Sequence, residues 1–182
     1  MKPMNIQSLY QQALAFAAAK HDASGQKMKG TNLPYIVHVC NVAMEILIAA
    51  PQSGDFNLPL AIQAALLHDT VEDTDTKIEE IEQLFGLDIA QGVLALTKDE
   101  SLPDAEQIGD SVQRIKKQPK EIWSVKLADR ITNLMPPPAE WNNEKIQSYI
   151  DDSYMILEEL KDGNVYLANR LSQKIKEYSQ YK

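Results

Sequence analysis

Apolar residues recur three and four positions apart along most of the chain, which is the spacing of one face of an α-helix. The pattern predicts helices at residues 5–20, 35–50, 58–67, 78–85, 88–96, 104–118, 121–134, 144–160 and 165–178. No stretch alternates apolar and polar residues between turn signals in the way that a half-buried strand does. We therefore predict an all-α fold, a single-domain bundle of about eight helices around one core, with residues 1–182 forming that domain.

One polar segment and two proline sites interrupt this helical pattern. Residues 22–32 contain two glycines and two lysines, a composition typical of an ordered loop. Pro34 follows this loop and is expected near the first turn of the next helix. The run Pro136–Pro138 ends the helix predicted at 121–134, because proline cannot continue a helical hydrogen-bond ladder.

The stretch Leu66–Thr74 carries the densest group of chemically active residues in the chain. It starts as the apolar end of a helix and then places one imidazole and three carboxylates within six residues. Buried charges are costly unless they are paired or bind a metal, so the His68-Asp69 pair indicates a metal site. His68 and Glu72 are four residues apart and would share one face of a continuous helix.

Two further residues interrupt apolar helical patterns in the same way. His38 lies early in the helix predicted at 35–50, and Asp129 is a charged residue within the helix predicted at 121–134. Together with His68-Asp69 they offer two imidazole nitrogens and two carboxylate oxygens. This mixed set suits Mn²⁺, Fe²⁺ or a similar ion in octahedral geometry, with positions open for water and substrate, and zinc remains an alternative.

Two more carboxylates, Glu72 and Asp73, follow the expected ligands by one helical turn. A metal with open positions can polarise a phosphoryl oxygen and acidify a bound water, and a nearby carboxylate can accept that water's proton. The alternative is that both carboxylates only charge the start of a short helix. The residues alone therefore favour metal-assisted hydrolysis, with a phosphate ester as the expected substrate.

Composition narrows the classes of partner. The net charge is −8 and no dense cluster of lysine and arginine occurs, which argues against a nucleic-acid partner. The longest apolar runs are shorter than the ~20 residues of a membrane span, and residues 1–12 lack the apolar core of a secretory signal. The single cysteine, Cys40, excludes an internal disulfide and fits a cytoplasmic location. The sequence leaves the oligomeric state open.

The order His38, His68-Asp69, Asp129 resembles the HD superfamily of metal-dependent phosphohydrolases. The chain is also similar to the hydrolase domain of the RelA/SpoT homologues, from about residue 10 to residue 160. The stretches that carry this similarity are Gly25–Gly30, Pro34–His38, Leu66–Thr74, Phe85-Gly86 and Val125–Leu134. Because no synthetase half is present, the chain resembles a small alarmone hydrolase, and the resemblance implies an HD-type helical bundle.

The resemblance implies manganese-dependent removal of the 3′-pyrophosphate from (p)ppGpp, a purine alarmone, to give GDP or GTP. The residues implied to hold Mn²⁺ are His38, His68, Asp69 and Asp129, and those implied to activate the attacking water are Glu72 and Asp73. The expected substrate-binding residues are Lys27, Lys29 and Thr31 beside the base, Asn133 and Tyr149 at the ribose or 5′ side, and Lys126 at a phosphate.

Several of these residues have a plainer interpretation. Lys27 and Lys29 are equally compatible with solvated loop side chains, and Tyr149 with core packing. Lys126 stands three residues before Asp129, so a salt bridge is as compatible with the spacing as phosphate binding. His21 lies outside the metal constellation and is expected to be structural or exposed.

Two departures from the family pattern bear on the substrate. The loop reads Lys27–Lys29 where the family usually has arginine, and lysine stacks on a purine less well than arginine does. The segment Asp104–Gln107, with Asp104 and Glu106, is acidic where the family tends to be basic. The open alternatives are another nucleotide at the same metal site, namely (p)ppApp, NADPH or a deoxynucleotide, or a non-catalytic alarmone sensor.

Overall fold

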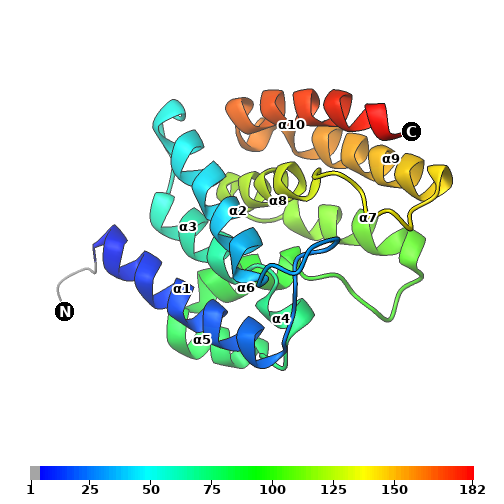
Figure 1. The fold of residues 1–182 in the computed structure, drawn as a ribbon. Helices are drawn as coiled ribbons and strands as arrows, with labels where there is room; N and C mark the ends of the chain where they lie inside the picture. The colour runs from blue at the N-terminus through cyan, green and yellow to red at the C-terminus, as the bar shows by residue number, and fades with distance from the viewer. Residues whose placement is uncertain (1–4) are drawn as a thin grey trace.

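The computed structural model describes residues 5–182, which form a bundle of helices (Figure 1). These residues contain ten α-helices, one of them a single turn, and no β-strand. The bounds are α1 Ile6–Ala23, α2 Ile36–Ala49, α3 Leu58–Leu67, α4 Thr70–Asp73, α5 Ile78–Phe85, α6 Leu87–Leu96, α7 Asp104–Ile115, α8 Lys120–Asn133, α9 Asn143–Leu160 and α10 Val165–Tyr178. The predicted all-α class is confirmed. The number of helices exceeds the prediction, in part because the single turn α4 was not foreseen.

The starts of four helices follow from their capping residues. Asn5, Asn57, Asn142 and Asn164 each accept a hydrogen bond from a backbone N–H in the first turn, at 2.8 to 3.2 Å. These caps satisfy donors that have no partner within the helix itself. At the other end of α5, Gly86 takes a φ of 94°, a backbone conformation that glycine adopts without a Cβ penalty.

α3 is the central helix of the bundle. Every residue from Leu60 to Leu67 is buried, and the helix packs against α1, α2 and α8. Small residues of α1, Ala13 and Ala17, are fully buried in the same core. Because alanine side chains are small, the backbone of α1 can approach α3 closely. α3 thus packs between α1, α2 and α8. Packing of this apolar helix thus determines where His68, the residue that follows it, is placed.

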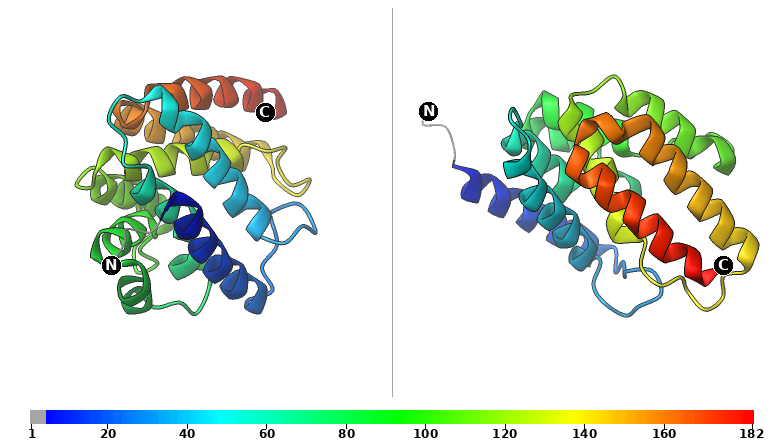
Figure 2. Two further views of the ribbon diagram at one scale, coloured as in Figure 1. Left: turned by 90° about the vertical axis from the view of Figure 1, so that its left-hand side faces the viewer. Right: turned by 90° about the horizontal axis from the view of Figure 1, so that it is seen from above.

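The C-terminal helices α9 and α10 run alongside each other and against α8 (Figure 2). The turn between them, Lys161–Gly163, packs directly onto α8. A Cβ on Gly163 would lie 2.6 Å from Cβ of Trp123, so only glycine allows this approach. α9 therefore lies where its residues can face the C-terminal half of α8. Among residues 5–182, no helix combines the length and the apolar character that crossing a membrane requires.

Candidate active site

The central motif lies at a break between α3 and α4. α3 ends at Leu67, and α4 begins only at Thr70, whose hydroxyl donates to the Leu67 carbonyl at 2.7 Å. His68 and Asp69 occupy the break. The expectation that His68 and Glu72 share one face of a continuous helix is therefore wrong, because the helix axis is interrupted between them.

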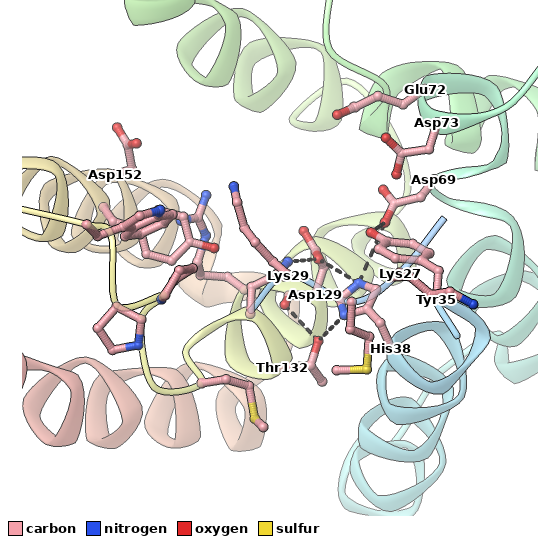
Figure 3. A pocket seen from close by; sticks show the side chains of 18 of the residues that line it. Lys27, Lys29, Tyr35, His38, Asp69, Glu72, Asp73, Asp129, Thr132 and Asp152 are labelled. Carbon is pink, nitrogen blue, oxygen red and sulfur yellow. Dashed lines mark hydrogen bonds and ion pairs between the residues drawn. The ribbon is translucent and has the colours of Figure 1, made fainter. Parts of the chain in front are cut away.

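Four side chains from three parts of the chain meet at this break. Figure 3 labels three of them, His38, Asp69 and Asp129. The four are His38 from α2, His68 and Asp69 from the α3–α4 break, and Asp129 from α8, with one possible ligand atom of each within 4.8 Å of the others. The Nε2 atoms of the two imidazoles are 3.4 Å apart. Oδ2 of Asp69 lies 2.9 Å from His68 Nε2, and Oδ1 of Asp129 lies 3.3 Å from His38 Nε2. The predicted metal ligands are thus brought together.

The outer nitrogens of both imidazoles are held by hydrogen bonds. Nδ1 of His68 donates to the Ala65 carbonyl at 2.8 Å. Nδ1 of His38 lies 3.3 Å from Oγ1 of Thr132, whose own proton goes to the Asp129 carbonyl at 2.9 Å, so Oγ1 accepts from the imidazole. The proton on each Nδ1 is thus held outward, and both Nε2 atoms face the centre, as they do in metal-binding histidines.

The two carboxylates are oriented in the same way. The hydroxyl of Tyr35 donates to Oδ2 of Asp69 at 2.5 Å. The ammonium of Lys126 lies 3.1 Å from Oδ2 of Asp129, and the amide of Asn133 donates to the other oxygen. Lys126 thus makes the salt bridge that the spacing allowed. Asn133 contacts a ligand carboxylate, and the substrate role expected for each of these two residues stays a prediction.

The electrostatics of the cluster favour a cation at its centre. Burial would lower the pKa of His68, but the carboxylates of Asp69 and Asp129 outweigh burial and raise that pKa well above its ordinary value. Burial would raise the pKa of Asp129, but Lys126 and the imidazoles hold it well below its usual range. The field that draws a proton to His68 would equally attract a divalent metal, so the donor set fits such an ion.

Glu72 and Asp73 have different surroundings although they are neighbours. The backbone N–H of Lys98 donates to Oε2 of Glu72 at 2.9 Å, and the Lys98 ammonium contacts Oε1. Among residues 5–182, no cation lies within ion-pair distance of Asp73. Burial raises the pKa of Asp73 to about 6, the charges of Asp69 and Glu72 add to the rise, and the charge of Lys98 only partly opposes it. Gln26 opposes the rise through a hydrogen bond to Asp73. Asp73 is thus suited to exchange a proton near neutral pH.

A cavity of about 460 Å³ opens beside the metal-ligand cluster and extends away from it. Its lining includes the predicted residues Lys27, Lys29, Lys126, Asn133 and Tyr149 as well as Glu72 and Asp73. It also includes four residues that the sequence did not indicate: Lys98, Arg130, Lys145 and Asp152. Asp152 lies across the cavity from the labelled carboxylates Asp69 and Glu72 (Figure 3).

Two groups of residues singled out in the sequence lie elsewhere. Thr31 does not line the cavity: its hydroxyl donates to the Met28 carbonyl and accepts from the Leu33 N–H, both at 3.1 Å. Its position therefore gives no support to a substrate contact. Asp104 and Glu106 lie in the first turn of α7, are exposed, and are likewise outside the lining.

The wall of the cavity away from the cluster is aromatic and basic. Tyr149 lies edge-on to Trp141, with ring centroids 5.2 Å apart. The ammonium groups of Lys29 and Lys145 lie 5.1 and 5.8 Å from the Trp141 ring, and the Arg130 guanidinium lies 4.4 Å from the Tyr149 ring. Tyr149, expected either in the core or at a ligand, is mostly buried and lines the cavity. Trp141 also lines this cavity.

The residues that sequence reasoning missed had weak signals. Arg130 directly follows the ligand Asp129, and Lys98 lies in a polar stretch that carried no motif. Lys145 lies four residues before Tyr149, a spacing that places both on one face of α9. Among these missed residues, only Lys145 could have been found from the sequence, through its helical spacing from Tyr149. His21, expected to be structural or exposed, is only 2% exposed and is therefore not a surface residue.

Comparisons with known proteins agree with this geometry. The chain matches the HD domain family over residues 13–157. The Danio rerio protein named guanosine-3′,5′-bis(diphosphate) 3′-pyrophosphohydrolase MESH1 is 37% identical over 163 residues, which cover 87% of each chain. The Homo sapiens protein of that name is 34% identical over 171 residues, covering 91% of this chain and 92% of its own.

A solved structure described as a metazoan ortholog of SpoT that hydrolyzes ppGpp has a similar fold. Its TM-score is 0.80 at 29% sequence identity, and the match covers 96% of this chain and 98% of that one. The resemblance inferred from the motifs is thereby confirmed. The chain belongs to the HD-domain family and, within it, to the group that contains the MESH1 proteins.

Proposed function

We propose that the protein is a metal-dependent pyrophosphohydrolase that removes the 3′-pyrophosphate from (p)ppGpp and releases GDP or GTP. The observation that carries the proposal is the arrangement of two imidazoles and two carboxylates at one side of a cavity whose other wall is aromatic and basic. An anionic purine nucleotide is complementary to such a cavity, since it offers both a stacking face and phosphates. The names of the similar proteins support the same substrate.

We propose Mn²⁺ as the metal, held by His38, His68, Asp69 and Asp129. Two nitrogen and two oxygen donors leave positions free for oxygen ligands in octahedral geometry, which suits Mn²⁺ better than a closed tetrahedral zinc site. When bound, such an ion polarises a phosphoryl oxygen and lowers the pKa of water.

A cytoplasmic location stays our expectation. Cys40 is the single cysteine of the sequence and forms no internal disulfide, which fits a reducing compartment.

The chain's own residues supply the proton transfer in this proposal. Water attacks the phosphorus attached to the ribose 3′ oxygen, and its proton passes to Asp73. The bond between that phosphorus and the 3′ oxygen breaks, and the 3′ oxygen takes up a proton to become the hydroxyl of the nucleotide product. Glu72 accepts hydrogen bonds from the backbone N–H and the ammonium of Lys98. In this way it holds the chain at Lys98 against α4 and shapes the water site. Lys126 and Asn133 keep Asp129 oriented.

The nucleoside part of the substrate would occupy the remaining cavity. Lys27 and Lys29 border the base, and Tyr149 contacts the ribose or the 5′ side. Both lysines are exposed, and an ammonium stacks on a purine less well than a guanidinium does, so we expect little geometric selection of the base. This arrangement predicts measurable turnover of an adenine alarmone such as (p)ppApp in addition to (p)ppGpp.

One experiment tests the proposed function. The purified protein, loaded with Mn²⁺, is incubated separately with ppGpp, ppApp and NADPH, and release of pyrophosphate or phosphate is followed by coupled colour formation. We expect pyrophosphate from ppGpp. Release of pyrophosphate only from ppApp, or of phosphate only from NADPH, would identify that nucleotide as the substrate of the same site. Binding of ppGpp without any release would instead identify an alarmone sensor.

A further inference from the structure

One side of α2 is apolar and uncovered. Met44, Leu47 and Ile48 are 43%, 42% and 45% exposed, although the opposite side of the same helix lies in the core. Side chains three and four residues apart share one side of a helix, so these three form a single stripe. Val37 and Cys40, both half-buried, extend the stripe toward the start of α2, and the five residues form the α2 face. A helix that is apolar on both sides is expected to be covered on both.

The polar residues of α2 leave this face without charge. Among acidic, basic and histidine residues the helix contains only His38 and Glu45, and both are buried. His38 belongs to the metal-ligand cluster. The Glu45 carboxylate accepts hydrogen bonds from Nε of Arg170, on α10, at 2.8 and 2.7 Å. The negative charge of Glu45 is thus neutralised by a neighbouring helix and adds no field to the α2 face.

The adjoining helix α1 continues the uncharged surface. Residues 6–19 contain no aspartate, glutamate, lysine, arginine or histidine. The exposed side chains of this stretch are amides and methyl groups: Gln7, Gln11, Gln12, Ala15 and Ala19. α2 lies between α1 and α10 and contacts both (Figure 1). An uncharged surface therefore spans α1 and α2, and α10 borders it.

A second group of exposed apolar residues has the opposite surroundings. Leu87 and Leu94 of α6 are 53% and 50% exposed. Glu82 of α5 and Asp88 of α6 are exposed on the same pair of helices and make that surface acidic. Two copies of this chain, each with a net charge of −8, would bring like charges together there, which is destabilising. The α2 face avoids this cost.

This difference in charge favours a second copy as the occupant of the α2 face. A basic partner would be attracted to the acidic surfaces of the chain and would gain no electrostatic energy at the α2 face. A second copy is itself acidic, so it approaches most easily where both surfaces lack charge. Contact through apolar side chains, Met among them, is typical of the buried centre of a homodimer interface.

The size of the surface limits how tightly two copies can bind. At 1.5 Å per residue, the 14 residues of α2 extend about 21 Å. A strip of that length and about 10 Å wide covers only about 200 Å², far below the ~800 Å² that each partner contributes to a standard interface. With α1 and α10 on either side at spacings of about 10 Å, the contact reaches about 600 Å². This area is sufficient for a reversible dimer.

We propose that the α2 face, with the adjoining sides of α1 and α10, binds a second copy of this chain in a two-fold symmetric dimer. A two-fold axis places the same surface on both partners, so the stripe of one copy packs on the stripe of the other. Removing Met44, Leu47 and Ile48 from water supplies the attraction. None of these three residues lines the cavity, so the dimer does not depend on the proposed function.

The test measures the mass of the full chain by sedimentation, from low to high micromolar concentration. Leu47→Glu and Ile48→Glu each place a carboxylate in the α2 face. Leu87→Glu makes the same change at a similarly exposed leucine outside it. Thermal melting of each variant confirms that it folds. Flotation with vesicles of neutral phosphatidylcholine tests whether a lipid surface, rather than a second copy, occupies the α2 face.

We expect the mass of the wild-type protein to rise from that of one chain to that of two, with a Kd of about 1 to 100 μM, as for interfaces of small area. Leu47→Glu and Ile48→Glu should each raise Kd about 100-fold or more, because two carboxylates would lie close together across the two-fold axis. Leu87→Glu should keep Kd within about twofold of wild type. None of the proteins should float with the vesicles.

A wild-type protein that keeps the mass of one chain at every concentration would overturn the dimer. A dimer weakened as much by Leu87→Glu as by Leu47→Glu would place the contact elsewhere and also overturn the proposal. Flotation of wild type that Leu47→Glu abolishes would identify a lipid surface as the occupant instead. Should Leu47→Glu fail to fold, Ile48→Glu decides the question. No turnover is measured, so failure of the proposed function leaves this test intact.

Discussion

Lys98 binds both carboxylate oxygens of Glu72, one through its backbone N–H at 2.9 Å and the other through its ammonium. Asp73, the next residue, contacts no such cation and has its pKa raised to about 6 by burial and by the charges of Asp69 and Glu72. Two adjacent carboxylates with the same expected role thus differ in charge environment. A proton acceptor works best when its pKa is close to the working pH, which favours Asp73.

We predict different kinetic effects for the two carboxylates. Asp73→Asn should lower kcat by about 100-fold or more, since the proton acceptor is lost, and should leave Mn²⁺ affinity within about twofold. Glu72→Gln should lower kcat by only about tenfold, because it weakens the ion pair with Lys98 and leaves Asp73 in place. Steady-state kinetics and metal calorimetry check both. Equal losses in kcat would show that the two groups act as one unit.

The carboxyl of Asp73 also has a predicted pH dependence. In metal-free protein its pKa is raised to about 6, so it should be protonated at pH 5 and ionised at pH 7. Burial favours the protonated form of this carboxyl. Above pH 6, where Asp73 is ionised, its burial therefore lowers the free energy of unfolding. A ¹³C carboxyl NMR titration, with the resonance assigned from Asp73→Asn, measures this value.

Added Mn²⁺ should move that titration to lower pH, because a nearby dication stabilises the carboxylate. The acid limb of the pH profile of kcat should follow the value measured with metal present. A carboxyl that titrates near pH 4 in the metal-free protein would contradict the assignment of Asp73 as the tuned group. The variant Asp151→Asn, which changes an exposed carboxylate of α9, serves as a control for general charge effects.

The metal-ligand cluster makes a prediction about stability. Mn²⁺ at about 100 times its Kd should stabilise the wild-type fold by about 2.7 kcal/mol and raise Tm accordingly. Asp69→Ala should abolish both the rise in Tm and the turnover, because one of the four donors is gone. Chelation with EDTA should reverse the effect in wild type. An Asp69→Ala protein that kept a full Mn²⁺-dependent rise in Tm would refute this ligand set.

Sequence reasoning singled out the expected metal ligands because they stand out against apolar helices. His38, His68 and Asp129 each interrupt a buried helical pattern, and a polar residue there must have a partner. Spacing could not reveal the break after Leu67, which depends on the hydrogen bond of the Thr70 hydroxyl. The helical class likewise follows from periodicity alone.

The basic wall of the cavity could not be predicted in the same way. Lys98 meets Glu72 across 26 positions in the sequence. Arg130 faces Tyr149 from a different helix. Such contacts depend on how helices pack, and no local pattern carries that information. The helical fold and the clustering of the expected metal ligands were therefore predictable, whereas the different charge environments of Glu72 and Asp73 were not.

His21 is a buried residue, which agrees with the structural one of the two roles expected for it. Its Nδ1 lies 2.7 Å from Oε1 of Gln26, and among residues 5–182 its Nε2 has no partner. Because Oε1 of Gln26 is an acceptor, Nδ1 of His21 carries the proton in this contact, and the amide N–H of Gln26 is left to donate toward Asp73. The ring also packs on Tyr35, at 4.9 Å between centroids, whose hydroxyl orients Asp69.

A matched pair of substitutions separates these two contacts of His21. His21→Phe keeps a ring beside Tyr35 but removes the donor to Gln26, and it should lower kcat about tenfold with KM within about twofold. His21→Asn keeps a donor near the Nδ1 position and should retain more of the rate. ¹⁵N NMR of the imidazole should show the Nδ1–H form. A Nε2–H form, or a His21→Phe enzyme as fast as wild type, would exclude positioning of Asp73 through Gln26.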